Sequence, residues 1–192
     1  MKKIFFALAA LALVACQPAP TPQNLAPISF TNQTKIRLAA VEIRVIEQYE
    51  PPMKSPNVEH IFFMTPTNAI KQWASDRLQA TGTSGLMELT IDDASVVEVP
   101  LPKTTGLRGF FTDDQSDRYD GKIRATFRIY DGVHAVAIAE GDVNVIRSRS
   151  VNEKATLQER ELLFHAMTQE MMTQFNGEAE KRLRQYFAAF LR

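Results

Sequence analysis

One stretch of alternating residues, 122–129, constrains the fold of this chain more than any other. Its apolar residues occupy every second position, at Ile123, Ala125, Phe127 and Ile129. Asp131-Gly132 separates this run from a second apolar run that begins at Val133. Because both residues of an Asp-Gly pair adopt the positive φ angles of a tight turn, the pattern predicts a β-hairpin. A turn of two residues places Phe127 opposite Val136, so that the apolar sides of the two strands coincide.

The polar side of the same hairpin carries a row of cations. Lys122, Arg124 and Arg128 share one side of the first predicted strand, and Arg147 and Arg149 follow where the second strand leaves the sheet. Two interpretations are open. In the first, the row is the ordinary solvated face of an antiparallel sheet, and its long side-chain stems cover the small residues beneath. In the second, these five side chains bind an anionic group, such as a lipid phosphate or an acidic partner protein.

Two further strands are predicted from alternation. Residues 36–45 alternate with one slip of phase, which predicts a single strand with a bulge at Ala39-Ala40. Residues 87–99 predict another strand that is prolonged irregularly. The predicted fold class is α+β, with an antiparallel sheet of about four strands in the order β-α-β-β-β-α and helices packed on one face.

Helical spacing appears in two places. Thr65-Pro66 supplies a cap and a proline at the first helical position, and Gly82 suits the end of that helix. Thr156 and Glu159 have the spacing of a capping box before a long helix. Asn176-Gly177 is a predicted stop, after which the chain forms either a kinked continuation or a separate last helix.

Residues 1–16 have the organisation of a targeting segment. Lys2 and Lys3 form a positive head, residues 4–15 carry no charge, and Leu13-Val14-Ala15-Cys16 closes the segment. The uncharged stretch is too short for a spanning helix, which needs about 20 residues. The four closing residues resemble the lipobox of bacterial lipoproteins. A secretory signal followed by a free thiol is the alternative, but the only cysteine of the chain stands where lipidation requires it.

The resemblance implies cleavage before Cys16 and attachment of a diacylglycerol and an N-acyl chain to that cysteine, with no other cofactor. The mature protein would then be anchored to an envelope membrane and face the periplasm. Gln17 stands where an aspartate favours the inner membrane, so the outer membrane is favoured. The expected organisation is a signal peptide at residues 1–15, the lipidated cysteine and a proline-rich tether at 16–35, and one α+β domain at 36–192.

Composition and motifs point away from nucleic acid and from catalysis. Removal of residues 1–15 takes away two lysines and leaves 20 basic against 22 acidic side chains, a balance without bulk attraction to nucleic acid. His60, His134 and His165 lie in three different predicted elements and form no local ligand cluster. The sequence therefore predicts no metal site and no catalytic residue.

The order of elements behind a lipobox and a proline-rich tether is similar to that of two families of periplasm-facing lipoproteins. These are the lipopolysaccharide-assembly lipoproteins and the auxiliary lipoproteins of ABC-type lipid transporters. The resemblance implies a non-enzymatic accessory or scaffold component of envelope lipid transport or outer-membrane assembly. Its partners would be the membrane, an envelope protein and an anionic lipid.

The alternative is a free-standing ligand-binding or structural envelope lipoprotein that uses the loops at Phe62-Phe63 and Phe110-Phe111. Two adjacent phenylalanines cannot both enter a core from one strand, so Phe110 and Phe111 are candidates for partner contact.

Overall fold

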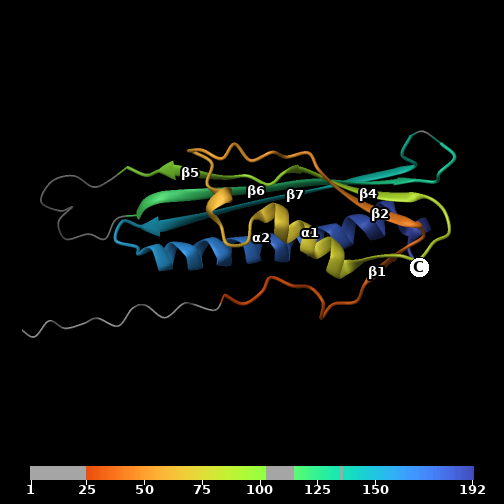
Figure 1. Ribbon diagram of the computed structural model, residues 1–192, viewed down its shortest axis with the longest axis horizontal. Coiled ribbons are helices and arrows are strands. Elements are labelled where there is room, and N and C mark those ends of the chain that lie inside the picture. The colour runs from red at the N-terminus through yellow and green to blue at the C-terminus, as the bar shows by residue number, and fades with distance from the viewer. Residues whose placement is uncertain (1–24, 103–114, 135) are drawn as a thin grey trace, which may run out of the picture.

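The computed structural model describes residues 25–102, 115–134 and 136–192. These residues form a five-stranded sheet, a two-stranded sheet, two α-helices and two short 3-10 helices (Figure 1). In chain order the elements are β1 (Ile36–Leu38), β2 (Glu42–Glu47), η1 (Glu59–Ile61), α1 (Pro66–Arg77), β3 (Leu78–Ala80), β4 (Leu86–Asp93), β5 (Val96–Pro100), β6 (Gln115–Tyr130), β7 (Ala139–Asn152), α2 (Leu157–Tyr186) and η2 (Ala188–Phe190).

The long strand β6 is the centre of the five-stranded sheet. β4 and β5 pair with the two ends of one edge of β6, and β7 pairs with the other edge along nearly its whole length. These three pairs are antiparallel, whereas β2 lies parallel to β4. Parallel neighbours need a crossover connection, and α1 lies between β2 and β4 in the chain. The predicted α+β class, with a mostly antiparallel sheet, is confirmed.

Two of the predicted strands are each divided in the structure. Residues 36–45 contribute to β1 and β2 instead of one bulged strand, because β1 pairs with β3 in a separate two-stranded sheet. Residues 87–99 contribute to β4 and β5, and the ladder between β4 and β6 shifts register close to the end of β4. The described chain therefore has more strands than predicted, and the prediction of a single strand with a bulge at Ala39-Ala40 is wrong.

Gly82 has a different role from the predicted helix stop. Helix α1 ends at Arg77 and continues directly into β3, so Gly82 lies beyond both elements. A Cβ atom at Gly82 would lie 2.5 Å from the carbonyl carbon of Ala39. The backbone N–H of Gly82 donates to the carbonyl of Ala40 at 3.0 Å. Close approach of two backbones, where only glycine fits, therefore explains this residue.

The hairpin between β6 and β7 is present, but its loop is longer than predicted. Ile129 pairs with Ala139 and Phe127 pairs with Gly141, so Phe127 does not face Val136. In this register Gly141, Val143 and Val145 share one buried face without a bulge. A Cβ atom at Gly141 would lie 3.2 Å from both the Phe187 and the Tyr186 rings. Packing against the carboxyl end of α2 therefore sets the register, in place of the local Asp-Gly turn.

Both α-helices pack on the same face of the sheet, as predicted (Figure 1). Trp73 of α1 meets Phe175 of α2 edge to face, with ring centroids 5.0 Å apart, and Phe127 of β6 lies 6.1 Å from the same indole. Thr65 caps α1, and Thr156 with Glu159 forms the predicted capping box of α2. These aromatic contacts form the centre of the core.

Helix α2 runs without interruption from Leu157 to Tyr186, so the predicted stop at Asn176-Gly177 is wrong. A glycine inside a helix costs about 1 kcal/mol relative to alanine. The buried stripe nevertheless continues beyond it, because Ala179 and Leu183 are fully buried. Their tertiary packing outweighs the local preference of Gly177.

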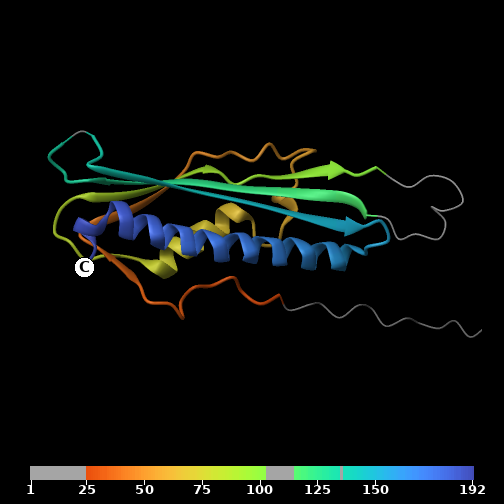
Figure 2. The same cartoon turned by 180° about the vertical axis from the view of Figure 1, so that it is seen from behind.

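Residues 25–35, here called the strap, lie along the two helices on the side away from the sheet (Figure 2). Ile28 and Phe30 are buried, and the backbone N–H of Phe30 donates to Oδ2 of Asp76 in α1 at 2.7 Å. The ring of His165 in α2 hydrogen-bonds the carbonyl of Ala26 at 2.8 Å. This part of the predicted tether is therefore held against the domain. Among the described residues, neither helix combines the length and apolar character that crossing a bilayer requires.

Candidate functional site

The five cations predicted on the hairpin lie on two faces of the sheet. Lys122, Arg124 and Arg128 alternate with buried residues of β6 and lie on the outer face. Arg147 pairs with Gly121, and Arg149 pairs with Tyr119. Directly paired residues of an antiparallel ladder share a face, and Tyr119 packs against Phe164 of α2. Arg147 and Arg149 therefore lie on the helix side, apart from the other three.

Most of these cations already have carboxylate partners. Lys122 lies 3.1 Å from Asp93, and Nε of Arg128 donates to Glu140 at 2.7 Å. The hydrogen bond to Glu140 raises the pKa of Arg128. Arg149 forms an ion pair with Glu170. In the described part of the chain, Arg124 has no ion-pair partner and Arg147 donates only to the carbonyl of Ile146. Anion binding at these residues stays a prediction.

The remaining predicted contact residues divide between described and undescribed parts of the chain. Cys16, Phe110 and Phe111 lie outside the described residues, so lipidation and partner contact there stay predictions. Phe62 is buried and stacks on Phe164 with ring centroids 4.3 Å apart. Phe63, in contrast, is 72% exposed. Of that pair, Phe63 is the side chain available for contact.

A pocket of about 530 Å³ opens at the carboxyl end of α2. It lies among the strap, β1, the last turns of α2 and the residues after η2. Five cationic side chains and one acidic side chain line it, and we call it the basic pocket: Lys35, Arg37, Arg77, Glu180, Arg184 and Arg192. Apolar atoms come from Ile36, Leu183 and Leu191. The pocket thus combines a surplus of positive charge with an apolar part.

Arg77 is the fixed member of the basic pocket, with a side chain only 3% exposed. Its Nε donates to Oδ1 of Asn176 at 2.9 Å, and its Nη2 donates to Glu180 at 2.8 Å. Nη1 donates to the carbonyl of Thr34 in the strap. Because two acceptors from α2 and one from the strap hold this guanidinium, its position is set before any ligand arrives.

Charge in the basic pocket is only partly neutralised. Glu180 accepts hydrogen bonds from Arg184 at 2.7 Å and from Arg77, and the pKa of Glu180 is lowered, chiefly by the Arg184 hydrogen bond. Lys35 donates to the carbonyl of Ser75 at 3.3 Å. The side chains of Arg37 and Arg192 are exposed and have no hydrogen-bond or ion-pair partner among the described residues. These two guanidinium groups are therefore available to an anion.

Sequence reasoning missed the basic pocket because its members are scattered along the chain. They come from the strap, β1, α1, α2 and the residues after η2, so no local spacing brings them together. The backbone N–H of Arg192 donates to the carbonyl of Arg37 at 3.0 Å, which places the last residues beside β1. The sequence carries no periodic signal for that pairing.

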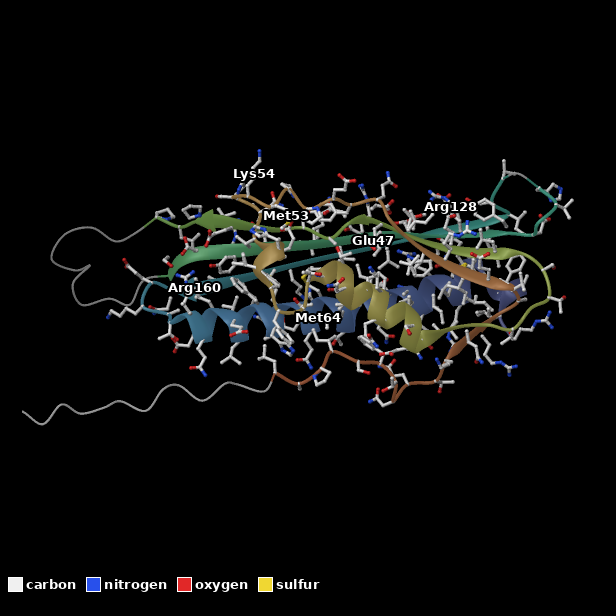
Figure 3. All side chains as sticks on the ribbon, viewed as in Figure 1. Glu47, Met53, Lys54, Met64, Arg128 and Arg160 are labelled. Atoms are coloured by element: carbon white, nitrogen blue, oxygen red, sulfur yellow. The ribbon has the colours of Figure 1, made fainter. Side chains whose placement is uncertain are left out.

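A second polar cluster lies at the other end of the domain, near the first turns of α2, where Figure 3 labels Arg160. The Tyr119 hydroxyl donates to Glu98 at 2.9 Å and accepts from Arg160 at 2.6 Å. Burial, followed by the hydrogen bond to Glu98, raises the pKa of Tyr119 to about 12. This phenol therefore stays protonated at neutral pH and joins β5, β6 and α2.

The histidines are dispersed in the structure. His134 lies 2.6 Å from Asp131 in the hairpin loop, and His165 holds the strap. Nδ1 of His60 is buried without a hydrogen-bond partner among the described residues. Within residues 25–102, 115–134 and 136–192, no group of three or more histidine, cysteine or acidic side chains has a metal-binding arrangement.

Comparison with known proteins gives no family. No family model matches the chain, and no curated protein is significantly similar to it. Among solved structures, rare lipoprotein B from Shewanella oneidensis has a TM-score of 0.36 and 12% identity, covering 73% of this chain and 94% of that chain. A protein from Xanthomonas campestris has a TM-score of 0.38 and 10% identity, covering 79% and 89%. A minor lipoprotein from Acinetobacter baumannii has a TM-score of 0.30 and 11% identity, covering 74% and 95%.

Likeness at these scores supports no assignment of family or function. The fold alone defines the class of this protein: an α+β domain with two helices on one face of a mostly antiparallel sheet.

Proposed function

We propose that this protein is a lipid-anchored envelope lipoprotein that faces the periplasm. In this proposal it is a non-enzymatic accessory or scaffold component of envelope lipid transport or outer-membrane assembly. The anchor rests on Leu13-Val14-Ala15-Cys16, with lipidation at Cys16 and a preference for the outer membrane from Gln17. Several acyl chains on one cysteine bind a membrane far more stably than one chain.

The observation that carries the accessory role is an exposed apolar loop at the end of the β6–β7 hairpin, which we call the hairpin tip. In it, Val133 is 84%, Val136 is 69% and Ile138 is 40% exposed. Single exposed apolar side chains are ordinary, but several together mark interaction sites. The loop projects beyond the sheet (Figure 1). An envelope protein that covers the hairpin tip would remove these side chains from water.

Affinity purification of the lipidated full chain from solubilised envelopes tests the proposal. We expect recovery of a lipid-transporter or outer-membrane assembly component with the wild-type chain. A Val133→Asp, Val136→Asp double variant should lose that component. The fold should persist, because both side chains are exposed in a loop.

Leu157→Asp is the matched control for this experiment. Leu157 is 87% exposed, and an acidic residue at the first position of a helix interacts favourably with the helix dipole. The control should retain the partner. Recovery of no transport or assembly component, or equal recovery with the tip variant, contradicts the accessory role.

The second candidate function is a free-standing ligand-binding lipoprotein, and the basic pocket is the observation that favours it. Recovery of a bound lipid with no protein partner would support this candidate in place of the accessory role.

A further inference from the structure

We infer that the basic pocket binds an amphiphile that carries a phosphate group, through Arg37, Arg184 and Arg192, with its apolar part against Ile36 and Leu191. The inference deepens the proposed function by naming a ligand class, and only the source of the ligand depends on that function.

Charge is the first argument. Five cationic side chains and one acidic side chain line the pocket. The carboxyl end of a helix adds about half a negative charge, which is small beside that surplus. On the sheet face, in contrast, Lys122 and Arg128 each have a carboxylate within 3.1 Å. The basic pocket is therefore the better site for an anion.

The donors available to a ligand are the second argument. Glu180 occupies Nε and one terminal nitrogen of Arg184. The other terminal nitrogen of Arg184 remains free for a ligand. The guanidinium groups of Arg37 and Arg192, which have no partner among the described residues, are also free. Arginine forks donate in pairs to phosphate oxygens, and a phosphate monoester offers three such oxygens. Several arginines from different segments thus match a phosphate better than a single planar carboxylate.

The size and apolar part of the pocket are the third argument. A volume of about 530 Å³ falls within the roughly 300–1,000 Å³ of small-molecule sites. An isolated phosphate would leave most of this space, and the partly exposed side chains of Ile36 and Leu191, in contact with water. A ligand with a glycerol or acyl portion beside its phosphate would cover them.

Preorganisation is the fourth argument. Arg77 is held by Asn176, Glu180 and the strap, so one wall of the pocket does not need to be ordered on binding. The backbone pairing between Arg37 and Arg192 likewise fixes the two free arginines on adjacent segments. Less conformational entropy is lost on binding when the contact groups are already in place.

Titration calorimetry on the lipidated full chain in a nonionic detergent tests the inference. The probes are dihexanoyl phosphatidic acid, dihexanoylglycerol, which lacks the phosphate, and inorganic phosphate. We expect saturable binding of phosphatidic acid at one site per chain and no measurable binding of dihexanoylglycerol. Inorganic phosphate should bind at least about tenfold more weakly, because it makes no apolar contact.

An Arg37→Ala, Arg192→Ala double variant should weaken phosphatidic acid binding by about a hundredfold, or about tenfold for each charge-assisted contact. An Arg37→Lys, Arg192→Lys double variant should lose less affinity for phosphatidic acid, since it keeps the charges but not the paired donors. Arg124→Ala, Arg147→Ala is the matched control, because it removes two exposed cations on the sheet and should bind like the wild type. Circular dichroism on each variant verifies the fold.

Each other outcome decides against part or all of the inference. Unchanged binding in the Arg37→Ala, Arg192→Ala variant, or an equal loss in the sheet control, overturns the site. Equal affinity for inorganic phosphate and phosphatidic acid would support an anion site in the pocket but overturn the inference that its ligand is an amphiphile. Partner recovery is a separate measurement, so failure of the proposed function and failure of this site are distinguishable.

Discussion

Asn176 joins both helices and the strap, and its replacement should destabilise the fold. Its Oδ1 accepts from Nε1 of Trp73 at 2.8 Å and from Nε of Arg77 at 2.9 Å. Its Nδ2 donates to Oε1 of Gln33 in the strap at 3.0 Å. Trp73 is fully buried and Arg77 is nearly so. An Asn176→Ala variant would therefore leave two buried donors without an acceptor.

The expected cost follows from those two donors. Each buried donor left unsatisfied costs about 1–3 kcal/mol, and alanine returns roughly 0.5 kcal/mol through its better helix propensity. We expect the free energy of unfolding to fall by about 3 kcal/mol. For a chain of this size that corresponds to a decrease in Tm of roughly 6–12 °C. Urea and thermal unfolding followed by circular dichroism measure both quantities.

Two further variants isolate the cause. Asn176→Asp keeps an oxygen acceptor for Trp73 and Arg77 and loses only the donor to Gln33, so it should cost less than half as much. Gln185→Ala changes an exposed amide of the same helix and should alter stability by less than about 0.5 kcal/mol. The reasoning is refuted if Asn176→Ala behaves like Gln185→Ala, or if the aspartate variant is as unstable as the alanine variant.

Four further single substitutions give the remaining predictions. Gly82→Ala forces a Cβ to 2.5 Å from a backbone atom and should lower the free energy of unfolding by about 1–3 kcal/mol. Gly177→Ala meets nothing within 4 Å and should raise it by up to about 1 kcal/mol. Urea unfolding measures both changes. The folded-state pKa of Glu180 is lowered. Its contribution to stability is therefore present above the unfolded pKa of about 4.3 and is lost as pH falls through the folded pKa. Glu180→Gln should flatten the stability–pH curve in that acidic window, and an unchanged curve counts against the ion pairs. Cys16→Ser should abolish lipid attachment and membrane retention while the domain still folds, and persistence in the membrane fraction would contradict lipidation.

The fold class followed from local patterns because each pattern is short in sequence. Alternation predicted residues 122–129 of β6, which begins earlier, at Gln115. The caps at Thr65 and Thr156 predicted where both helices begin. Each local expectation that proved wrong was overridden by a distant contact. The Asp131-Gly132 turn yielded to the packing of Gly141 on the end of α2, and the Gly177 stop yielded to the buried stripe that continues to Leu183.

Local sequence patterns could not predict the basic pocket either, because contacts between residues distant in the sequence form it. Arg77 and Glu180 form an ion pair although 103 positions separate them, and neither residue lies in a recognisable motif. The cationic row at Lys122, Arg124 and Arg128 was visible because alternation places its members on one face. Its carboxylate partners, Asp93 and Glu140, come from neighbouring strands whose register the sequence does not specify.

If Cys16 carries lipid as proposed, the strap limits how far the domain can move from the membrane. Residue 26 is held at His165, and about nine residues separate it from Cys16 in the sequence. A chain of that length spans at most roughly 30 Å when fully extended. Helix α2, with 30 residues, is about 45 Å long. The link is thus shorter than the helix beside which it starts. The domain would then pivot about the first third of α2, where His165 lies, within a shallow layer above the lipid. Release of Ile28 and Phe30 from the helices would roughly double the depth of that layer.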